Sequence, residues 1–564
     1  MSRQSELPTA TGTRQADGDA AGTETRHPAH LHRMARAGGL SMVGAGISAI
    51  CGVALVAVIT NGLPKDLAGT IFATTSLFLI ATAIVQMGTD TGLVRWLPAQ
   101  MVTGKVTDVV PTLRVAMVPV TTLSLLAAGV VLVIAPDVAE LVAGPEHADT
   151  VAAQLRVLAV FLPLTALYNI TLAASRGFRT MLPTVAVESI GRSVVQIAAI
   201  AAAQILGLGA VGVVLAWSLP YAAAFTVAAV WLFVLIRRMK GRASTRRQRT
   251  SPPDSDTSTA SPAGPPERSL TAQFWSFTAP RAIATMSQTL LKRFDIVLVA
   301  ALRSPADAAL YTAATRFVTF GQLGVQALQQ ALAPQLSALF ARKEYDSAQD
   351  LYKTTTAWSM MLAWPVYLGC AVLATSLLRF FGAGYSSAAA VVVVLSLTML
   401  MATASGFVDT VLLMSGRSWL SLANVGTALA VNIGLNLVLI RWYGILGAAI
   451  SWAVAIVIRN ALPLIEIKFL LGMSPLGSGT VWVALSAAGC FGIIPGALRI
   501  AGASTPVTLG ALIAGAVAYL VLIWLGRERL NLSAFRGVVR RRISKNAEAE
   551  TPEAVTVSSG PDRD

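Results

Sequence analysis

Charged side chains occur inside segments of the sequence that are otherwise apolar. Glu188 and Arg192 stand one helical turn apart in "VESIGRS", and Lys292, Arg293 and Asp295 occur together in "LLKRFDIVL". An arginine can donate two hydrogen bonds at once to a phosphate or carboxylate. A carboxylate in such a segment could instead bind a cation or a proton. These residues predict a polar site inside an apolar protein.

Arg316 is the strongest of these candidates. It lies in "ALYTAATRF", about nine residues into its apolar segment, and no acidic residue lies one turn away. The same segment carries Gln322, Gln326, Gln329 and Gln330, three of which share a face at helical spacing. A guanidinium beside amides suits an anionic ligand that also carries hydroxyl groups. We therefore expect Arg316 to line a polar cavity that binds a sugar phosphate.

The remaining candidates divide into two roles. The substrate-binding set in a central cavity is Arg316, Arg192, Arg459, Lys292, Arg293, Gln322 and Gln326. The set for ion coupling or gating is Asp295, Asp409, Asp90 and Glu188. Structural alternatives exist for several of them. Glu188 and Arg192 could form a purely structural pair, and Lys292 and Arg293 could extend to the outer headgroups.

Long apolar segments must position these residues. The chain has 564 residues, of which 55% are hydrophobic and 13% charged, whereas soluble domains carry roughly 25% charged residues. Continuous apolar runs of about 20 residues predict helices that cross a bilayer. We predict an all-α polytopic membrane protein with about fourteen spans, at 37–59, 68–91, 111–135, 153–174, 183–206, 210–236, 275–301, 307–333, 352–377, 386–413, 418–440, 445–468, 479–498 and 506–526.

The loop charges predict an orientation. Lysine and arginine accumulate in alternate loops, and such loops lie on the cytoplasmic side. The loop "PDVAELVAGPEHADT" is acidic apart from His147 and belongs to the opposite set. We expect a multi-pass protein of the plasma (inner) membrane with both termini cytoplasmic. The net charge of +15 is then explained by cytosolic loops that face anionic lipid headgroups, and it indicates no nucleic-acid partner.

Cysteine and histidine give no sign of a metal or redox centre. The three cysteines, Cys51, Cys370 and Cys490, lie in apolar runs without a CxxC motif. Such residues are typical of small buried fillers. Three of the four histidines lie in the polar N-terminal tail. We predict no metal site and no cofactor, apart from possible coupling to H⁺ or Na⁺.

One phrase occurs twice in the chain. "GAVGVVLAW" ends at Trp217 and "GILGAAISW" ends at Trp452, in the predicted sixth and twelfth spans. Small residues three or four apart let helices approach closely, and packing is the favoured role of the two tryptophans. The duplication predicts two parallel six-helix lobes around a central cavity, as in secondary transporters.

The predicted organisation follows from this duplication. The chain divides into a disordered cytoplasmic tail (1–36), an N-lobe (37–236), a basic and then Pro/Ser/Thr-rich tether (237–274), a C-lobe (275–470), two additional helices (471–526) and a basic cytoplasmic tail (527–564).

Several local patterns resemble one known family. They are "GTIFATTSLFLIATAIVQMGTDTGLVRWL", "FDIVLVAAL" followed by "ALYTAATRF", "ALAPQLSALFARKEYDSAQDLY" and "YGILGAAISW". In order and spacing they resemble the polysaccharide transporters, the O-antigen and exopolysaccharide flippases of the multidrug/oligosaccharidyl-lipid/polysaccharide (MOP) exporter superfamily. The resemblance covers about Ala35 to Leu471.

This resemblance implies a flippase for cell-surface polysaccharide biosynthesis. By alternating access it would move an undecaprenyl-pyrophosphate-linked oligosaccharide from the inner to the outer leaflet. Cavity arginines and lysines bind substrate in that family, and the resemblance transfers this kind of role to Arg316 and Arg192. Polysaccharide assembly proteins are further possible partners.

Other functions fit parts of the sequence. A lipid II flippase would share the span count and a cationic cavity. A cation-coupled multidrug antiporter has fewer spans and a cavity dominated by carboxylates. A membrane glycosyltransferase needs catalytic carboxylates or a large outer loop, and the outer loops here are short. A non-transporting envelope scaffold is the remaining alternative. We predict that the protein is not an enzyme.

Overall fold

The structure is a computed structural model that describes residues 27–103, 106–178, 180–250 and 269–532. Every regular element within these residues is helical, which confirms the predicted all-α membrane protein. The predictions for residues 1–26, 251–268 and 533–564 lie outside the described residues.

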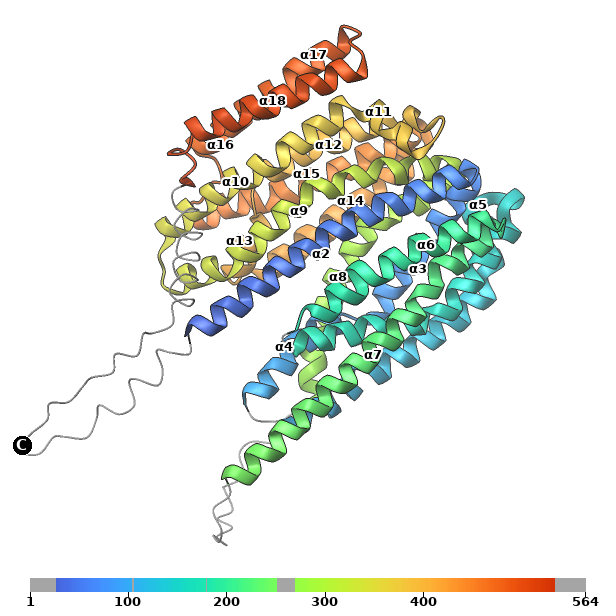
Figure 1. Cartoon of the computed structure of the whole chain (residues 1–564), viewed down its shortest axis with the longest axis vertical. Coiled ribbons are helices and arrows are strands. Elements are labelled where there is room, and N and C mark those ends of the chain that lie inside the picture. Colours follow the sequence, from blue (N-terminus) through green and yellow to red (C-terminus); the bar gives the residue numbers. More distant parts are fainter. Residues whose placement is uncertain (1–26, 104–105, 179, 251–268, 533–564) are drawn as a thin grey trace, which may run out of the picture.

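Two groups of helices lie side by side (Figure 1). The first comprises α3 (Lys65–Gln86), α4 (Thr89–Val102), α5 (Val109–Gly177), η2 (Thr184–Arg192), α6 (Ser193–Ile205) and α7 (Gly209–Thr250). The second comprises α9 (Pro305–Ala341), α10 (Tyr345–Val372), α11 (Ala374–Leu378), α12 (Ala389–Ala404), α13 (Val408–Met414), α14 (Ser418–Tyr443) and α15 (Ile445–Leu471). Helices α2 (His27–Gly62) and α8 (Leu270–Leu302) lie where the groups meet.

The number of spans depends on how α5, α8, α9 and the bent pair of α10 and α11 are counted. Ten described helices are long and apolar enough to cross a membrane, or eleven with the bent pair of α10 and α11. Gly144 (φ 68°) divides the 69-residue α5 into two, because at about 1.5 Å per residue an undivided helix would be far longer than the bilayer is thick. Helices α8 and α9, of 33 and 37 residues, are long enough but more polar. With the bent pair counted and α5 divided, twelve described spans result, and the predicted fourteen is reached only when α8 and α9 are counted as well.

Helix α3 forms much of the contact between the two groups. It packs against α5 on one side and against α8 and α9 on the other. Ala68, Ile71 and Ala73 of α3 are fully buried. At Gly69 an added Cβ would overlap the backbone carbonyl of Pro305 at the start of α9. Glycine is therefore required where these two helices approach most closely.

Two helices extend beyond the predicted spans. Helix α2 begins at His27, before the predicted start of the first span at 37, and α7 continues to Thr250, into the predicted tether. The extension of α7, 237–250, is rich in arginine and ends in a polar segment. Arginine has a high helix propensity, so a polar segment next to a stable helix continues it.

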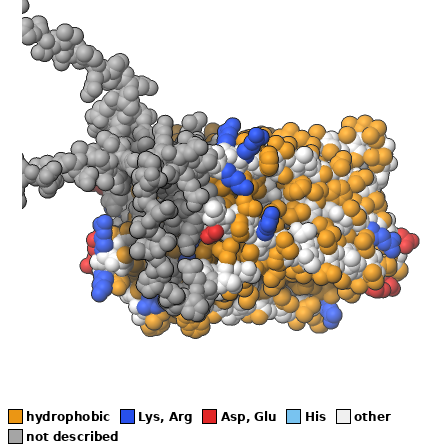
Figure 2. All heavy atoms as spheres, turned by 90° about the horizontal axis from the view of Figure 1, so that it is seen from below, with side chains coloured by type: hydrophobic (Ala, Val, Ile, Leu, Met, Phe, Trp, Pro, Cys, Tyr) orange, Lys and Arg blue, Asp and Glu red, His pale blue; other side chains and the backbone are white. Residues whose placement is uncertain are grey.

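The C-terminal helices form an outer layer on the second group (Figure 1). This layer comprises α16 (Ser478–Ala487), η5 (Ala488–Ile493), α17 (Ile494–Ile500) and α18 (Thr505–Leu525). Trp358 of α10 donates to the carbonyl of Leu530 at 2.9 Å, and Tyr519 of α18 donates to the carbonyl of Met361 at 3.2 Å. Hydrophobic side chains predominate on the face shown in Figure 2, as a lipid-facing surface requires.

Candidate central cavity

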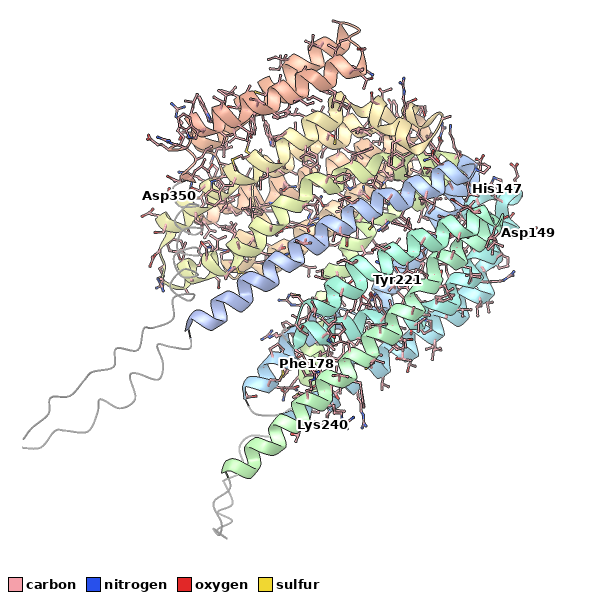
Figure 3. The ribbon with its side chains drawn as sticks, viewed as in Figure 1. His147, Asp149, Phe178, Tyr221, Lys240 and Asp350 are labelled. Atoms are coloured by element: carbon pink, nitrogen blue, oxygen red, sulfur yellow. The ribbon has the colours of Figure 1, made fainter. Side chains whose placement is uncertain are left out.

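A cavity of about 330 Å³ lies between the two groups of helices. Both groups and both boundary helices contribute side chains to it, although they are far apart in the sequence. In Figure 3, Tyr221 of its wall lies between the end that carries His147 and Asp149 and the end that carries Lys240. The charged and polar lining residues are Ser48, Thr75, Ser76, Thr165, Asn169, Glu188, Arg192, Ser193, Gln196, Tyr221, Arg293, Thr312 and Arg316.

Arg192 is held in position by two neighbours. Its Nη1 donates to Oε1 of Gln196 at 2.9 Å, and its guanidinium lies 4.8 Å from the ring centroid of Tyr221. Gln196 in turn donates from Nε2 to the carbonyl of Trp217 at 2.7 Å. Arg192 ends the π-helical segment η2, a type of turn found frequently at functional sites. The guanidinium is therefore fixed at the cavity wall while part of it remains available to a ligand.

Arg316 and Arg293 reach the same cavity from the second half of the chain. The start of α9 sets the register of Arg316, because Ser304 caps the helix by accepting from the amide of Asp307 at 3.1 Å and Pro305 occupies the first turn. Thr312 and Arg316, one turn apart, then both face the cavity. Neither Arg293 nor Arg316 forms an ion pair with any residue that the structure describes.

Several polar atoms at this cavity have no hydrogen-bond partner in the described structure. They include the Nε atoms of Arg192 and Arg316 and the hydroxyls of Thr165 and Thr312, all of which are buried. Buried polar atoms are normally hydrogen-bonded, and leaving them unpaired is costly. Their shared location indicates that water or a polar ligand completes their hydrogen bonding.

Glu188 is the single carboxylate among the described lining residues. It does not form the ion pair that its spacing from Arg192 suggests, because Arg192 turns toward Gln196 and Tyr221. With Arg192, Arg293 and Arg316 opposite one carboxylate, the cavity is net positive.

Aromatic rings form one wall of the cavity. Trp217 packs edge-on against Phe78 with centroids 5.7 Å apart, and Tyr221 packs against Tyr168 at 5.9 Å. Trp217, which ends the first copy of the repeated phrase, is 7% exposed and lines the cavity. The expected packing role is thus combined with a place in the wall. The Tyr221 ring supports the guanidinium of Arg192 from this wall.

The other predicted substrate-binding residues lie outside this cavity. Arg459 forms an ion pair with Asp409 at 3.2 Å. Lys292 is exposed, although it is adjacent to Arg293, because consecutive residues of a helix point in different directions. Gln322 is half-buried and Gln326 is exposed, and neither lines the cavity.

Asp295 of α8 occupies a separate buried position against α9 and α14 of the second group. Its Oδ2 accepts from Tyr311 at 3.2 Å and its Oδ1 accepts from Nδ2 of Asn436 at 2.8 Å. The side-chain amide of Asn432, one turn before Asn436, is buried with no partner in the described structure. The carboxylate and the Tyr311 hydroxyl supply oxygen atoms here, whereas Asn436 presents its amide nitrogen. Oxygen atoms are the ligands that hard cations prefer.

Sequence reasoning missed the residues that organise the arginines. Gln196 and Tyr221 had no signal beyond a polar residue and an aromatic residue in apolar segments. The sequence places Arg95 beside Asp90 at the inner end of a predicted span and Arg176 in a basic loop, but it gives no sign that both join Arg281 in one pocket at one end of the helices.

Comparisons with known proteins agree with this architecture. The sequence model of the family described as "Polysaccharide biosynthesis protein" matches residues 257–390. The probable low-salt glycan biosynthesis flippase Agl15 of Haloferax volcanii is 21% identical over 254 residues, which cover 44% of this chain and 52% of that protein. The chain therefore spans about half the length of this curated relative.

Solved structures share the fold over most of the chain. The lipid II flippase MurJ in an inward closed conformation superposes with a TM-score of 0.66 at 12% identity, covering 86% of this chain and 98% of that one. An inward-facing multidrug resistance MATE family transporter of the MOP superfamily gives 0.56 at 14% identity, covering 78% and 95%. These comparisons confirm the resemblance drawn from the sequence. The chain is a polytopic membrane protein with the fold of the MOP superfamily.

Proposed function

We propose that this protein is a flippase that moves a lipid-linked oligosaccharide from the inner to the outer leaflet of the plasma membrane, with both of its termini cytoplasmic. The observation that carries the proposal is the central cavity. Arg192 from the first half of the chain and Arg293 and Arg316 from the second half line one space, beside unpartnered hydroxyls and an aromatic wall. The named function of the relative Agl15 supports the same class of activity.

The chemistry of the cavity fits an anionic sugar carrier. A charge at mid-membrane depth costs about 2.5–3.5 kcal/mol on insertion scales, and this cavity holds three arginines. A pyrophosphate would offset these charges through bidentate hydrogen bonds. The hydroxyls and rings would bind the sugars, while the lipid tail would stay in the bilayer. With the inside negative, the potential assists outward transfer by about 2.3 kcal/mol per charge per 100 mV.

We further propose that Asp295 couples transport to a cation or a proton. Its carboxylate is surrounded by Tyr311 and Asn436, with the unpartnered amide of Asn432 nearby in sequence. The site lies on α8, the helix that also carries Arg293. Occupancy of the carboxylate by a cation could therefore alter the position of a substrate-binding arginine.

A lipid II flippase is the second candidate, because the fold superposes on that of MurJ with a TM-score of 0.66, against 0.56 for the MATE family transporter. Both candidates share a pyrophosphate and differ in the sugars. A multidrug antiporter for cations is less compatible with a net positive cavity.

Transport by the purified protein in vesicles tests the proposal. The vesicles would contain labelled lipid-linked oligosaccharide or lipid II, and sugar reaching the opposite leaflet would be measured. We expect Arg316→Ala to lower the rate at least about tenfold through loss of charge-assisted hydrogen bonds. Arg303→Ala is the matched control, because Arg303 pairs with Asp307 at 3.7 Å and is 45% exposed.

The two substrates and their products separate the alternatives. Faster transfer of the oligosaccharide than of lipid II supports the proposed substrate class, and recovery of the lipid-linked sugar chemically unchanged supports a carrier rather than an enzyme. Normal transport by Arg316→Ala would contradict the assigned site. Failure of the wild-type protein to move either substrate would contradict the function.

A further inference from the structure

A second cationic pocket lies at one end of the helices, apart from the central cavity. It has a volume of about 440 Å³, and its lining residues include Asp90, Arg95, Arg176, Phe277 and Arg281. None of its lining residues lines the central cavity. Arg176 lies two residues before Phe178, which Figure 3 places away from His147 and Asp149. By the loop charges this is the cytoplasmic end.

Two of the arginines share one aromatic ring. The guanidinium of Arg95 lies 3.9 Å from the ring centroid of Phe277, and that of Arg281 lies 4.7 Å from it. Contacts of this kind are stabilising when the cation lies within about 6 Å of the ring centroid. Because the ring contacts the planar groups, their hydrogen-bond donors remain free to bind another partner.

The pocket has an excess of positive charge. Arg95, Arg176 and Arg281 face it with Asp90 as the one carboxylate among the described lining residues. None of these four forms an ion pair with a described residue. Like charges held close together repel. Binding of an anion in the pocket would offset this repulsion and is therefore favourable. Arg95 and Arg281 are both exposed, and this leaves the pocket accessible from the membrane surface.

The pocket joins the two halves of the chain. Arg95 lies on α4 and Arg176 at the end of α5, whereas Phe277 and Arg281 lie on α8. The backbones of α4 and α8 are close together here. A Cβ added at Gly88 (φ +70°) would lie 2.8 Å from the amide nitrogen of Ala282.

We propose that Arg95, Arg176 and Arg281, supported by the ring of Phe277, bind the phosphate group of an anionic lipid headgroup in the inner leaflet. Arginine recognises phosphate through paired hydrogen bonds, and anionic headgroups concentrate near basic residues at the cytoplasmic surface. A lipid bound there contacts both halves of the chain. It therefore stabilises the contact between α4 and α8.

Binding is tested on the purified full-length protein in nanodiscs of phosphatidylcholine with or without phosphatidylglycerol, followed by native mass spectrometry of the retained lipid. In a separate experiment, inorganic phosphate is titrated into the protein and the midpoint of thermal unfolding is measured. This experiment tests a soluble phosphate as the ligand. We expect phosphatidylglycerol to be retained by the wild type and about tenfold less by Arg281→Gln, as for the loss of a charge-assisted hydrogen bond. Arg342→Gln is the control, because Arg342 is an exposed arginine between α9 and α10 that does not line the pocket.

Phe277→Leu tests the support that the ring gives, since it keeps an apolar side chain on α8 and removes the aromatic face. We expect it to weaken retention less than Arg281→Gln does. Equal retention by the wild type and Arg281→Gln, or an equal loss in Arg342→Gln, would overturn the proposal. If inorganic phosphate stabilised the protein but phosphatidylglycerol was not retained, the proposal that the ligand is a lipid would be overturned. The binding assay does not depend on transport, so a negative result would not contradict the proposed flippase function. A negative result in the transport assay would likewise not contradict lipid binding at this pocket.

Discussion

Gln196 links Arg192 to the backbone of a neighbouring helix. Arg192 donates to its Oε1 at 2.9 Å, and the Nε2 of Gln196 donates to the carbonyl of Trp217 at 2.7 Å. One amide side chain thereby fixes both the position of a cavity cation and the distance between α6 and α7. The role of the repeated phrase that ends at Trp217 is explained in part by this bond, because it places a backbone carbonyl at the cavity wall.

Replacement of Gln196 by leucine should lower transport about tenfold, because a hydrogen bond to a charged group contributes about 1.5–3 kcal/mol. The initial rate of transfer in vesicles is the measurement. Gln204→Leu is a control on the same helix, since Gln204 bonds to the carbonyl of Val58 at 3.1 Å and does not line the cavity. Equal rates in Gln196→Leu and the wild type would show that Arg192 needs no such support.

Asp295→Asn should abolish stimulation of transport by an ion gradient while the protein stays folded. The amide keeps the volume of the carboxylate, and its oxygen can accept from Asn436 while its NH2 group donates to the Tyr311 hydroxyl in reversal of the wild-type bond, but it removes the charge that a cation or proton would neutralise. Transport rates with imposed sodium and pH gradients give the readout. Asp307→Asn, at a partly exposed ion pair with Arg303, should respond to the gradients as the wild type does. Undiminished stimulation in Asp295→Asn would exclude this carboxylate from coupling.

Gly69→Ala should lower the midpoint of thermal unfolding and reduce transport. The added methyl group would overlap the Pro305 carbonyl, and neither backbone can move without separating α3 from α9. Gly129→Ala is the matched control, since nothing lies within 4 Å of its added Cβ. Removal of a helical glycine should leave that variant unchanged or more stable by about 1 kcal/mol. Equal midpoints for the two variants would mean that the close approach at Gly69 is not required.

The pair of Arg459 and Asp409 is expected to act structurally. Their side chains are 23% and 24% exposed and 3.2 Å apart, and partly exposed ion pairs contribute about 1 kcal/mol or less. A double-mutant cycle with Arg459→Gln and Asp409→Asn should show a small coupling in thermal stability and near-normal transport in every variant. A large loss of transport in Arg459→Gln that Asp409→Asn does not restore would return Arg459 to the substrate site.

Much of the fold could be predicted because the bilayer imposes strict lengths and hydropathy on spanning helices. Even α8 and α9, whose charges and glutamines lower their hydropathy, were expected as spans. The extension of α7 to Thr250 could not be predicted from hydropathy, which gives no signal for a polar continuation of a helix.

The sequence predicts the type of residue that forms the cavity, but not which of the candidate residues lie in it. Arg316, Arg192 and Arg293 share one cavity as unpaired charges in apolar segments, but the same pattern also selected Arg459 and Lys292. Arg459 and Lys292 differ from the three cavity arginines only in the surroundings that their positions on the helices face. That depends on packing between distant segments, such as the close approach of α3 to α9 at Gly69 and Pro305, and no single segment encodes it.

The most direct test of a hydrated, positively charged central cavity uses the native thiol of Cys51. This cysteine lines the cavity and is half-buried, whereas Cys370 and Cys490 are buried elsewhere. We predict that an anionic water-soluble thiol reagent labels Cys51 faster than a cationic one of similar size, that Arg316→Ala removes the preference, and that Cys51→Ser removes the labelling. Absence of labelling in the folded wild-type protein, or faster labelling by the cationic reagent, would contradict a wet cavity lined by arginines.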